Sequence, residues 1–146
     1  MPQFSRTATT DWKGSIMEGG GTTTAATGAF SLPLTFPRRI GAAEGSTSPE
    51  ELIAAAHATC YAMVLAGMLG RNNATAKSHQ VTCTVTADKG DAGIKIITSR
   101  LDVVAEGLHG MDAAKFETSA KDAEKGCPVS NALRASVAIE VHVTVK

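Results

Sequence analysis

The chain has 146 residues, of which 43% are hydrophobic, and this length and composition predict one globular domain spanning residues 1–146. Lys+Arg and Asp+Glu each number 14, so the net charge is zero, which argues against a nucleic-acid-binding protein because such proteins need a basic face. The three cysteines, Cys60, Cys83 and Cys127, cannot all pair within one chain, and the first residues lack the apolar core of a signal peptide. We therefore expect a cytoplasmic protein with reduced or catalytic thiols.

The first third of the chain predicts strands and turns. Gly19–Gly21 is expected to be a turn between two Thr-rich segments. Apolar residues then alternate with polar residues and prolines over residues 30–37, which predicts a strand. Because proline cannot donate to a ladder, this strand is expected at a sheet edge. Residues 38–47 are rich in glycine and small residues and predict a loop.

Residues 49–69 predict a long and almost wholly apolar helix, ended by Gly70. Ser48 is the expected N-cap, since a residue before proline avoids the helical region, and Glu51 falls where a capping-box carboxylate reaches back to the cap. The segment is barely long enough to span a membrane. Its many alanines and its one histidine, His57, favour a core helix, so no membrane association is expected.

The second half predicts a hairpin, two helices and a last strand. Strands are expected at 79–87 and 94–105, with a turn at 88–93 between them. Asp112 can cap a helix that ends near Lys125, with an inward face formed by four residues: Ala113, Phe116, Ala120 and Ala123. Pro128 suits the first position of a short helix that ends near Arg134, with Cys127 as its cap.

Alternating apolar residues over 137–145 predict a closing strand, which completes an α+β fold in which a sheet covers the long helix. That helix is apolar on every side, so one sheet cannot cover it alone. We expect a second copy of the chain to cover the remaining faces, which predicts a homodimer.

Two thiols are candidates for redox chemistry. Cys60 lies inside the long apolar helix and Cys127 at the start of the short one, where the positive end of a helix favours the thiolate. Cys83 falls on the apolar face of a strand and is interpreted as structural. Cys60 has the same simple alternative, because free cysteines are commonly buried as small apolar residues.

A thiolate at Cys60 would need a cation close by, and an arginine stays charged when buried. Arg38 and Arg39 precede the helix, and Glu50 could hold such a guanidinium by a paired hydrogen bond. Glu50 lies ten positions before Cys60, which is about 15 Å along a straight helix. Either two antiparallel helices in a dimer or a kink in the helix would bring the two together.

Metal binding is a weaker alternative. His57 with Cys60 and His79 with Cys83 are spaced as pairs of zinc ligands can be, but no C-x-x-C or H-x-x-H companion accompanies them. We interpret His57 as a packed helix residue and expect neither a metal nor a cofactor.

Three stretches, Ser48–Cys60, Asp91–Gly93 and Gly126–Ser130, resemble the OsmC/Ohr family of thiol-dependent peroxidases, and the OsmC branch in particular. The resemblance implies antiparallel sheets wrapped around a central buried helix in an intertwined homodimer. It implies Cys60 as the peroxidatic thiol, Cys127 as the resolving thiol, and Glu50 as partner of a catalytic arginine. Where the family has one arginine before Phe-Glu, this chain has Arg38-Arg39-Ile40; Arg39 is our first choice and Arg38 the second.

The implied activity is reduction of organic hydroperoxides to alcohols, in defence against oxidative stress. Cys60 would become a sulfenic acid, Cys127 would form a disulfide with it, and an external dithiol, for which a lipoylated protein is one candidate, would reduce that disulfide. Two other functions are kept as alternatives. One is a non-enzymatic dimeric module that binds an apolar ligand between its helices, and the other is a metal-binding or redox-sensing protein.

Overall fold

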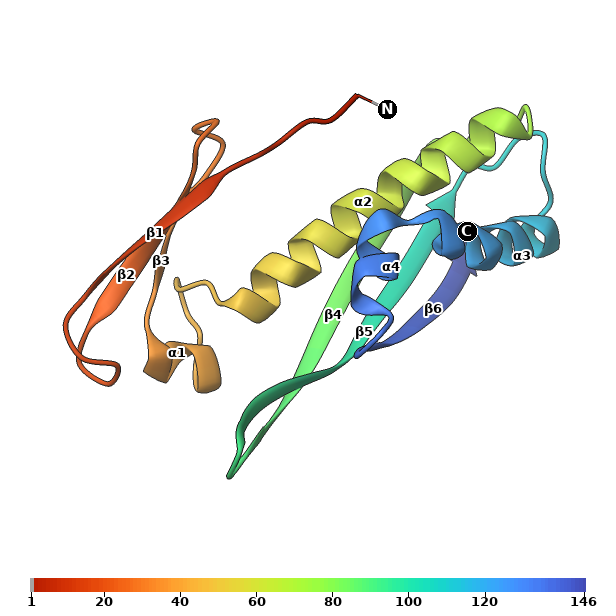
Figure 1. Ribbon diagram of the computed structural model, residues 1–146. Helices are drawn as coiled ribbons and strands as arrows, with labels where there is room; N and C mark the ends of the chain where they lie inside the picture. The colour runs from red at the N-terminus through yellow and green to blue at the C-terminus, as the bar shows by residue number, and fades with distance from the viewer. Residues whose placement is uncertain (1) are drawn as a thin grey trace. The chain divides into compact units, whose positions relative to one another are not determined.

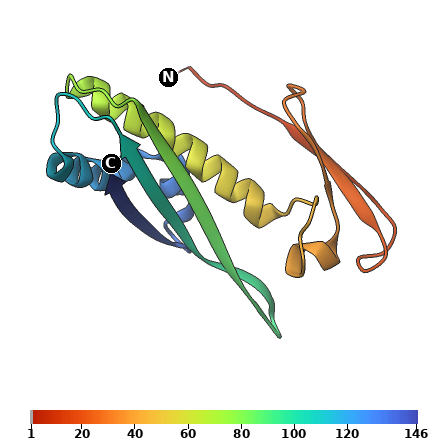
Figure 2. The same cartoon turned by 180° about the vertical axis from the view of Figure 1, so that it is seen from behind.

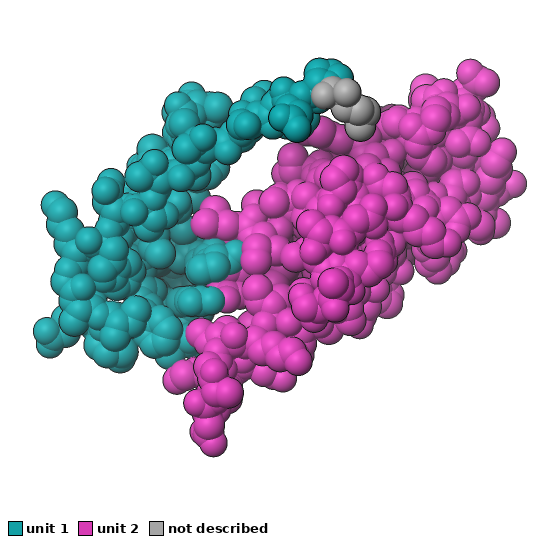
Figure 3. Space-filling view, in the orientation of Figure 1, with its two compact units in different colours: residues 1–49 teal, residues 50–146 magenta. Residues whose placement is uncertain are grey.

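The fold follows the α+β order that the sequence predicts, with strands, a long helix, a hairpin, two helices and a last strand. The computed structural model describes residues 2–146. It divides into two units, residues 1–49 and residues 50–146, which are coloured separately in Figure 3. Each unit is described below by itself.

The first unit contains an antiparallel sheet in the order β1–β2–β3, formed by β1 (Ala8–Lys13), β2 (Gly20–Ala25) and β3 (Ser31–Leu34). The predicted turn at Gly19–Gly21 is wrong by a few residues, because Gly20 and Gly21 already pair with Lys13 and Trp12 in the ladder. The reason is steric. A Cβ at Gly21 would lie 2.5 Å from the Asp11 carbonyl oxygen, so the strand itself requires a glycine there.

β3 is an edge strand, as its prolines predict, but it ends at Leu34. The segment 38–47 is not wholly a loop, because α1 (Phe36–Ile40) forms a short helix that contains Arg38 and Arg39. The Thr35 hydroxyl caps this helix by accepting a hydrogen bond from the Arg38 backbone N–H. A Thr-Phe-Pro sequence supplies both an N-cap and an early proline, a helix-start signal that the strand-like alternation of residues 30–37 obscured.

The central element of the second unit is α2 (Pro49–Arg71), which is continuous over 23 residues (Figure 1). The prediction that Gly70 ends it is wrong, because the helix continues one residue further to Arg71. Asn73 ends it instead, in the left-handed region with φ 51°, and the Ala74 backbone N–H donates back to the Leu69 carbonyl. Asparagine adopts this conformation more readily than most residues and closes helices as glycine does.

The second sheet has the order β4–β5–β6, formed by β4 (Ser78–Gly90), β5 (Gly93–Glu106) and β6 (Ala138–Val145). β4 and β5 form the predicted antiparallel hairpin, with a register shift between Thr86 and Ala87. β6 pairs with β5 in parallel, whereas antiparallel sheets were expected. Parallel neighbours require a long crossover, and the helical segment between β5 and β6 supplies it.

That crossover contains α3 (Ala113–Ala123), a 3-10 turn η1 (Glu124–Gly126) and α4 (Pro128–Leu133). The Asp112 carboxylate caps α3 as predicted. Ala113 is exposed rather than inward-facing, because it lies in the open first turn, whereas Phe116 and Ala120 are fully buried. The two opposite views in Figures 1 and 2 place α2, α3 and α4 on one face of the β4–β5–β6 sheet. The core between these layers includes Tyr61, Leu101 and Phe116.

Within the described residues of the second unit, one face of α2 is covered. Its buried residues, His57, Tyr61, Leu65, Met68 and Leu69, recur at helical spacing. A second stripe, formed by Ala56, Thr59, Met63, Ala66 and Gly70, is exposed, and Met63 is 70% accessible. By length and composition α2 could cross a membrane, but core helices of soluble proteins pass the same test, so one such helix is weak evidence.

Candidate active site

The two candidate redox thiols come from different helices of the second unit. Cys60 lies near the middle of α2 and is partly buried, and Cys127 is the fully buried N-cap residue of α4. Cys127 has the extended backbone that precedes a helix, with φ −83° and ψ 113°, and Pro128 occupies the first helical turn. The Gly-Cys-Pro order therefore orients the start of α4 as the sequence predicts.

The Cys60 thiol is hydrogen-bonded to the Cys127 thiol, and the Val129 backbone N–H donates to the Cys60 sulfur. Burial raises the pKa of Cys60, and the neighbouring Cys127 raises it further, while the Val129 N–H lowers it. The 66 residues between Cys60 and Cys127 form the loop that this pair closes. The structure thus brings together the two cysteines singled out in the sequence, and both are free thiols.

His57, one turn before Cys60 on α2, lies at the centre of a buried polar cluster. Its Nδ1 lies 2.6 Å from the Ser99 Oγ of β5, and its Nε2 lies 2.6 Å from the Ser130 Oγ of α4. Cys83 joins the same cluster, with its sulfur 3.2 Å from the Ser99 Oγ. His57, Ser99 and Ser130 are each 0% exposed. His57 is therefore a packed residue, as interpreted from the sequence, and it connects three elements.

A partly buried ion pair lies within electrostatic range of His57. The Arg134 guanidinium is 2.7 Å from the Glu124 carboxylate, and the Glu124 residue is only 6% exposed. Burial lowers the pKa of His57; the Glu124 carboxylate opposes this shift and the Arg134 guanidinium adds to it. The imidazole is consequently neutral near pH 7, with one donor and one acceptor nitrogen for its two serine partners.

Glu50 lies in the first turn of α2 and Cys60 near its middle. Because α2 is one uninterrupted α-helix, its geometry separates these residues by about 15 Å along the axis. A kink that would bring Glu50 to Cys60 within one chain is therefore not the arrangement seen in α2 (Figure 1).

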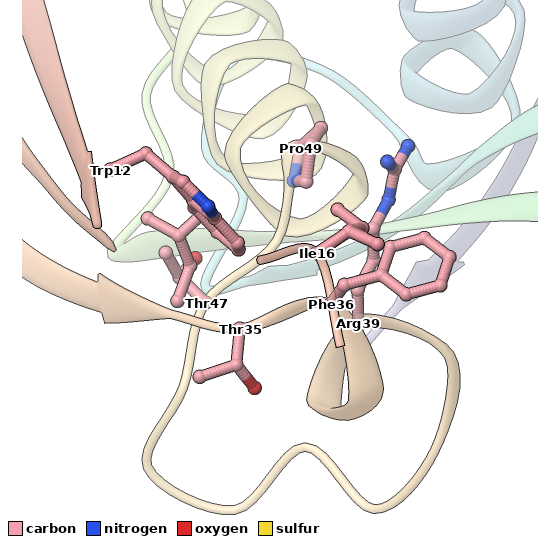
Figure 4. A pocket seen from close by; sticks show the side chains of 8 residues that line it. Trp12, Ile16, Thr35, Phe36, Arg39, Thr47 and Pro49 are labelled. Atoms are coloured by element: carbon pink, nitrogen blue, oxygen red, sulfur yellow. The ribbon is translucent and has the colours of Figure 1, made fainter. Parts of the chain in front are cut away.

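The two candidate arginines differ in their surroundings within the first unit. The Arg38 guanidinium donates to the Glu44 carbonyl at the surface. Arg39 lines a pocket of about 90 Å³, shown in Figure 4, where its side chain lies beside the ring of Phe36. The other lining residues are mainly apolar: Trp12, Ile16, Leu34, Thr35, Thr47 and Pro49.

Ser99 and Ser130 were not singled out as functional residues from the sequence. Ser99 carries a detectable signal, because it is a polar residue in phase with Leu101 and Val103 on the buried face of β5. The register shift opposite this part of β5 obscures that phase in the sequence. Ser130 belongs to the Gly126–Ser130 stretch, but nothing local indicates that its hydroxyl points to a histidine 73 positions away.

The suggested zinc pairs have other partners in the structure. His79 Nε2 lies 3.0 Å from the Ala62 carbonyl oxygen, and Cys83 contacts Ser99 as described above. Within residues 2–146, no group of three or more His, Cys, Asp or Glu residues is arranged to hold a metal ion.

Sequence comparison finds relatives along most of the chain. The profile of the family described as "OsmC-like protein" matches residues 41–142. Peroxiredoxin OsmC of Escherichia coli K12 is 38% identical over 134 residues, which are 90% of this chain and 92% of that protein. The organic hydroperoxide resistance protein-like 2 of Staphylococcus saprophyticus is 32% identical over 120 residues, or 80% and 81% of the two chains.

Solved structures share the fold. An organic hydroperoxide resistance protein OsmC from Legionella pneumophila superposes with a TM-score of 0.77 at 23% identity, over 99% of each chain. OhrB of Bacillus subtilis superposes with a TM-score of 0.73 at 24% identity, over 94% of this chain and 98% of that one. At these identities the likeness concerns the fold alone, and it agrees with the predicted α+β architecture.

Proposed function

The chain belongs to the family of OsmC-like proteins, and we propose that it is a thiol-dependent peroxidase that reduces organic hydroperoxides and so protects against oxidative stress. The contact between the Cys60 and Cys127 thiols carries this proposal. The names of the relatives, peroxiredoxin and organic hydroperoxide resistance protein, support the same activity. The profile match at 41–142 includes parts of both units, which supports the expectation that residues 1–146 act as one domain.

The proposed cycle needs only thiol chemistry. The Cys60 thiolate attacks the terminal oxygen of the hydroperoxide, the O–O bond breaks, and the alcohol leaves after taking up a proton. Cys60 is then a sulfenic acid. The Cys127 sulfur displaces the hydroxyl group as water and forms the Cys60–Cys127 disulfide. An external dithiol, such as the dihydrolipoyl group of a lipoylated protein, reduces that disulfide by two exchange steps.

Cys60 must ionise for this cycle to begin, but burial raises its pKa. We therefore assign Arg39 as the cation that stabilises the thiolate and the peroxide oxygens, with Glu50 as the carboxylate that holds its guanidinium. The surroundings of Arg39 favour it over Arg38, since Arg39 lines a largely apolar pocket. An apolar environment strengthens the attraction between a guanidinium and an anion.

A homodimer is the assembly that we propose. The exposed stripe on α2 is built from small and apolar residues, including Met63 and Ala66, and such a stripe suits a second copy of the same helix. An antiparallel crossing of two α2 helices would also place Glu50 of one copy near Cys60 of the other. All three cysteines are free, which agrees with a cytoplasmic location.

Titration of the fully reduced protein with cumene hydroperoxide tests the proposal. One equivalent is expected to remove two of the three thiols per chain, with peptide mapping locating a Cys60–Cys127 disulfide and Cys83 remaining free. C127S is expected to lose one thiol and to stop at the sulfenic acid, and C60S to lose none. C83S is the matched control and should retain the two-thiol loss.

Two other outcomes would change the conclusion. No thiol loss in the unaltered protein would reject the peroxidase and favour a module that binds an apolar ligand without chemistry. Peroxide reduction that survives in C60S would reject Cys60 as the reacting group. R39K and R38K distinguish the two candidate arginines. Only replacement of the catalytic arginine should slow the first turnover.

A further inference from the structure

The His57 cluster lies beside the reacting thiols but contains no atom that reacts in the proposed cycle. Both ring nitrogens have short contacts, 2.6 Å each, to hydroxyl groups on two different elements. A neutral imidazole has one N–H donor and one acceptor nitrogen, and each nitrogen has a serine hydroxyl as its nearest partner, while the Cys83 sulfur also lies 3.8 Å from Nδ1. The ring orientation is thereby fixed, and each serine is held at a defined position relative to α2.

The spacing of the cluster repeats the spacing of the thiols. His57 precedes Cys60 by three residues on α2, and Ser130 follows Cys127 by three residues at the start of α4. Two links therefore join the same pair of helices, one turn apart: the thiol pair, with its Val129 contact, and the His57–Ser130 hydrogen bond. The second link is 0% exposed at both ends.

Only one of these links survives the first chemical step. When Cys60 becomes a sulfenic acid, its sulfur gains an oxygen, and the thiol pair that joined the two helices is replaced by a new arrangement. The His57–Ser130 bond contains no reacting atom. Disulfide formation then requires the two sulfur atoms to approach to about 2.05 Å with a restricted dihedral angle, so the backbone of Cys127 must stay within narrow limits.

We propose that His57 is a positioning residue which, by binding Ser130 of α4, keeps Cys127 aligned on Cys60 for disulfide formation; this inference rests on the proposed function. The proposed role of His57 concerns only the second step of the cycle, in which the disulfide forms. There the Cys127 S–H loses its proton, a sulfur–sulfur bond forms, and the sulfur–oxygen bond of Cys60 breaks to release water. The Cys127 sulfur is oxidised and the sulfenic sulfur of Cys60 is reduced.

Ser130→Ala and Ser99→Ala form a matched pair for the test. Each removes one buried hydroxyl that lies 2.6 Å from one nitrogen of the same ring. S99A also removes the Ser99 contact to the Cys83 sulfur, so it disturbs the cluster at least as much as S130A does. Only Ser130 lies on the helix that begins at Cys127, whereas Ser99 lies on β5. A general structural role predicts the same effect from both substitutions, and a positioning role predicts an effect from S130A alone.

The measurement is a single turnover with one equivalent of cumene hydroperoxide and dimedone, which traps sulfenic acids. Mass spectrometry then gives the ratio of the Cys60–dimedone adduct to the Cys60–Cys127 disulfide. For S130A we expect this ratio to rise about fivefold, the equilibrium equivalent of one ordinary hydrogen bond, while the rate of peroxide consumption is unchanged. For S99A we expect a ratio close to that of the unaltered protein.

The outcomes separate the inference from the proposed function. An unaltered protein that forms no disulfide rejects both. An unaltered protein that completes the cycle, together with equal ratios in S130A and S99A, rejects the inference alone. If S130A does not fold, His57→Gln and His57→Asn replace it, because the glutamine amide reaches the position of Nε2 and can still bind Ser130, while the asparagine amide cannot. A lower adduct ratio in H57Q than in H57N then supports the inference, and equal ratios reject it.

Discussion

Mild acid is expected to destabilise the protein through His57. Burial lowers the pKa of His57 in the folded state, whereas the unfolded chain has the ordinary value of about 6.5. Between these values the unfolded state binds a proton that the folded state does not, so the free energy of unfolding falls as the pH drops below 6.5. The stabilising neutral form is fully present above that pH.

The loss of unfolding free energy cannot exceed the contribution of one proton, because a single imidazole titrates. If the folded state bound no proton at all, lowering the pH from 7.5 to 5 would reduce the free energy of unfolding by about 2 kcal/mol. The charges that face the ring set how much of this limit is reached, since Glu124 raises the pKa of His57 and Arg134 lowers it. Other shifted groups act outside this range. The lowered pKa of Asp102 matters only below about pH 4, and the raised pKa values of Cys60 and Cys83 matter only in alkali.

Urea unfolding at several pH values between 7.5 and 5 measures how the free energy of unfolding changes with pH. H57N removes the titrating group, so its free energy of unfolding should change less with pH, even though this variant is less stable at every pH. H109N, which replaces an exposed histidine, is the control and should keep the slope of the unaltered protein. If H57N and the unaltered protein lose stability in parallel as the pH falls, the reasoning is wrong and the acid sensitivity lies elsewhere.

Two further predictions concern packing. Tyr61→Phe removes the hydroxyl that donates to the Ala120 carbonyl in the core, and should lower the free energy of unfolding by about 1–3 kcal/mol, measured by urea unfolding, because a buried acceptor is left unsatisfied. Gly21→Ala places a Cβ 2.5 Å from the Asp11 carbonyl oxygen and should destabilise the β1–β2 ladder, lowering the Tm by several degrees. Gly90→Ala, where a Cβ meets nothing within 4 Å, is its control, and an equal loss of Tm in both variants would contradict the steric argument.

Local sequence signals predicted most elements of the second unit. Asp112 caps α3 and Pro128 begins α4 as expected, because caps and early prolines act through groups only a few residues away. The misplaced boundaries have local causes as well. Gly20 and Gly21 belong to a strand because a neighbouring carbonyl excludes a side chain there, and Asn73 rather than Gly70 ends α2.

The sequence by itself determined the α+β class and the long apolar helix, and it singled out Cys60 and Cys127 as candidate redox thiols, since periodicity, caps and the paired motifs are written in neighbouring residues. The contact of Cys60 with Cys127 was suggested there only through a resemblance, and the tertiary structure places the two thiols together. The parallel pairing of β5 with β6 and the His57–Ser99–Ser130 cluster were decided by the tertiary structure alone. Their partners lie tens of residues apart, and a hydrogen bond across such a separation depends on how helices and sheet pack, which no local pattern of residues specifies.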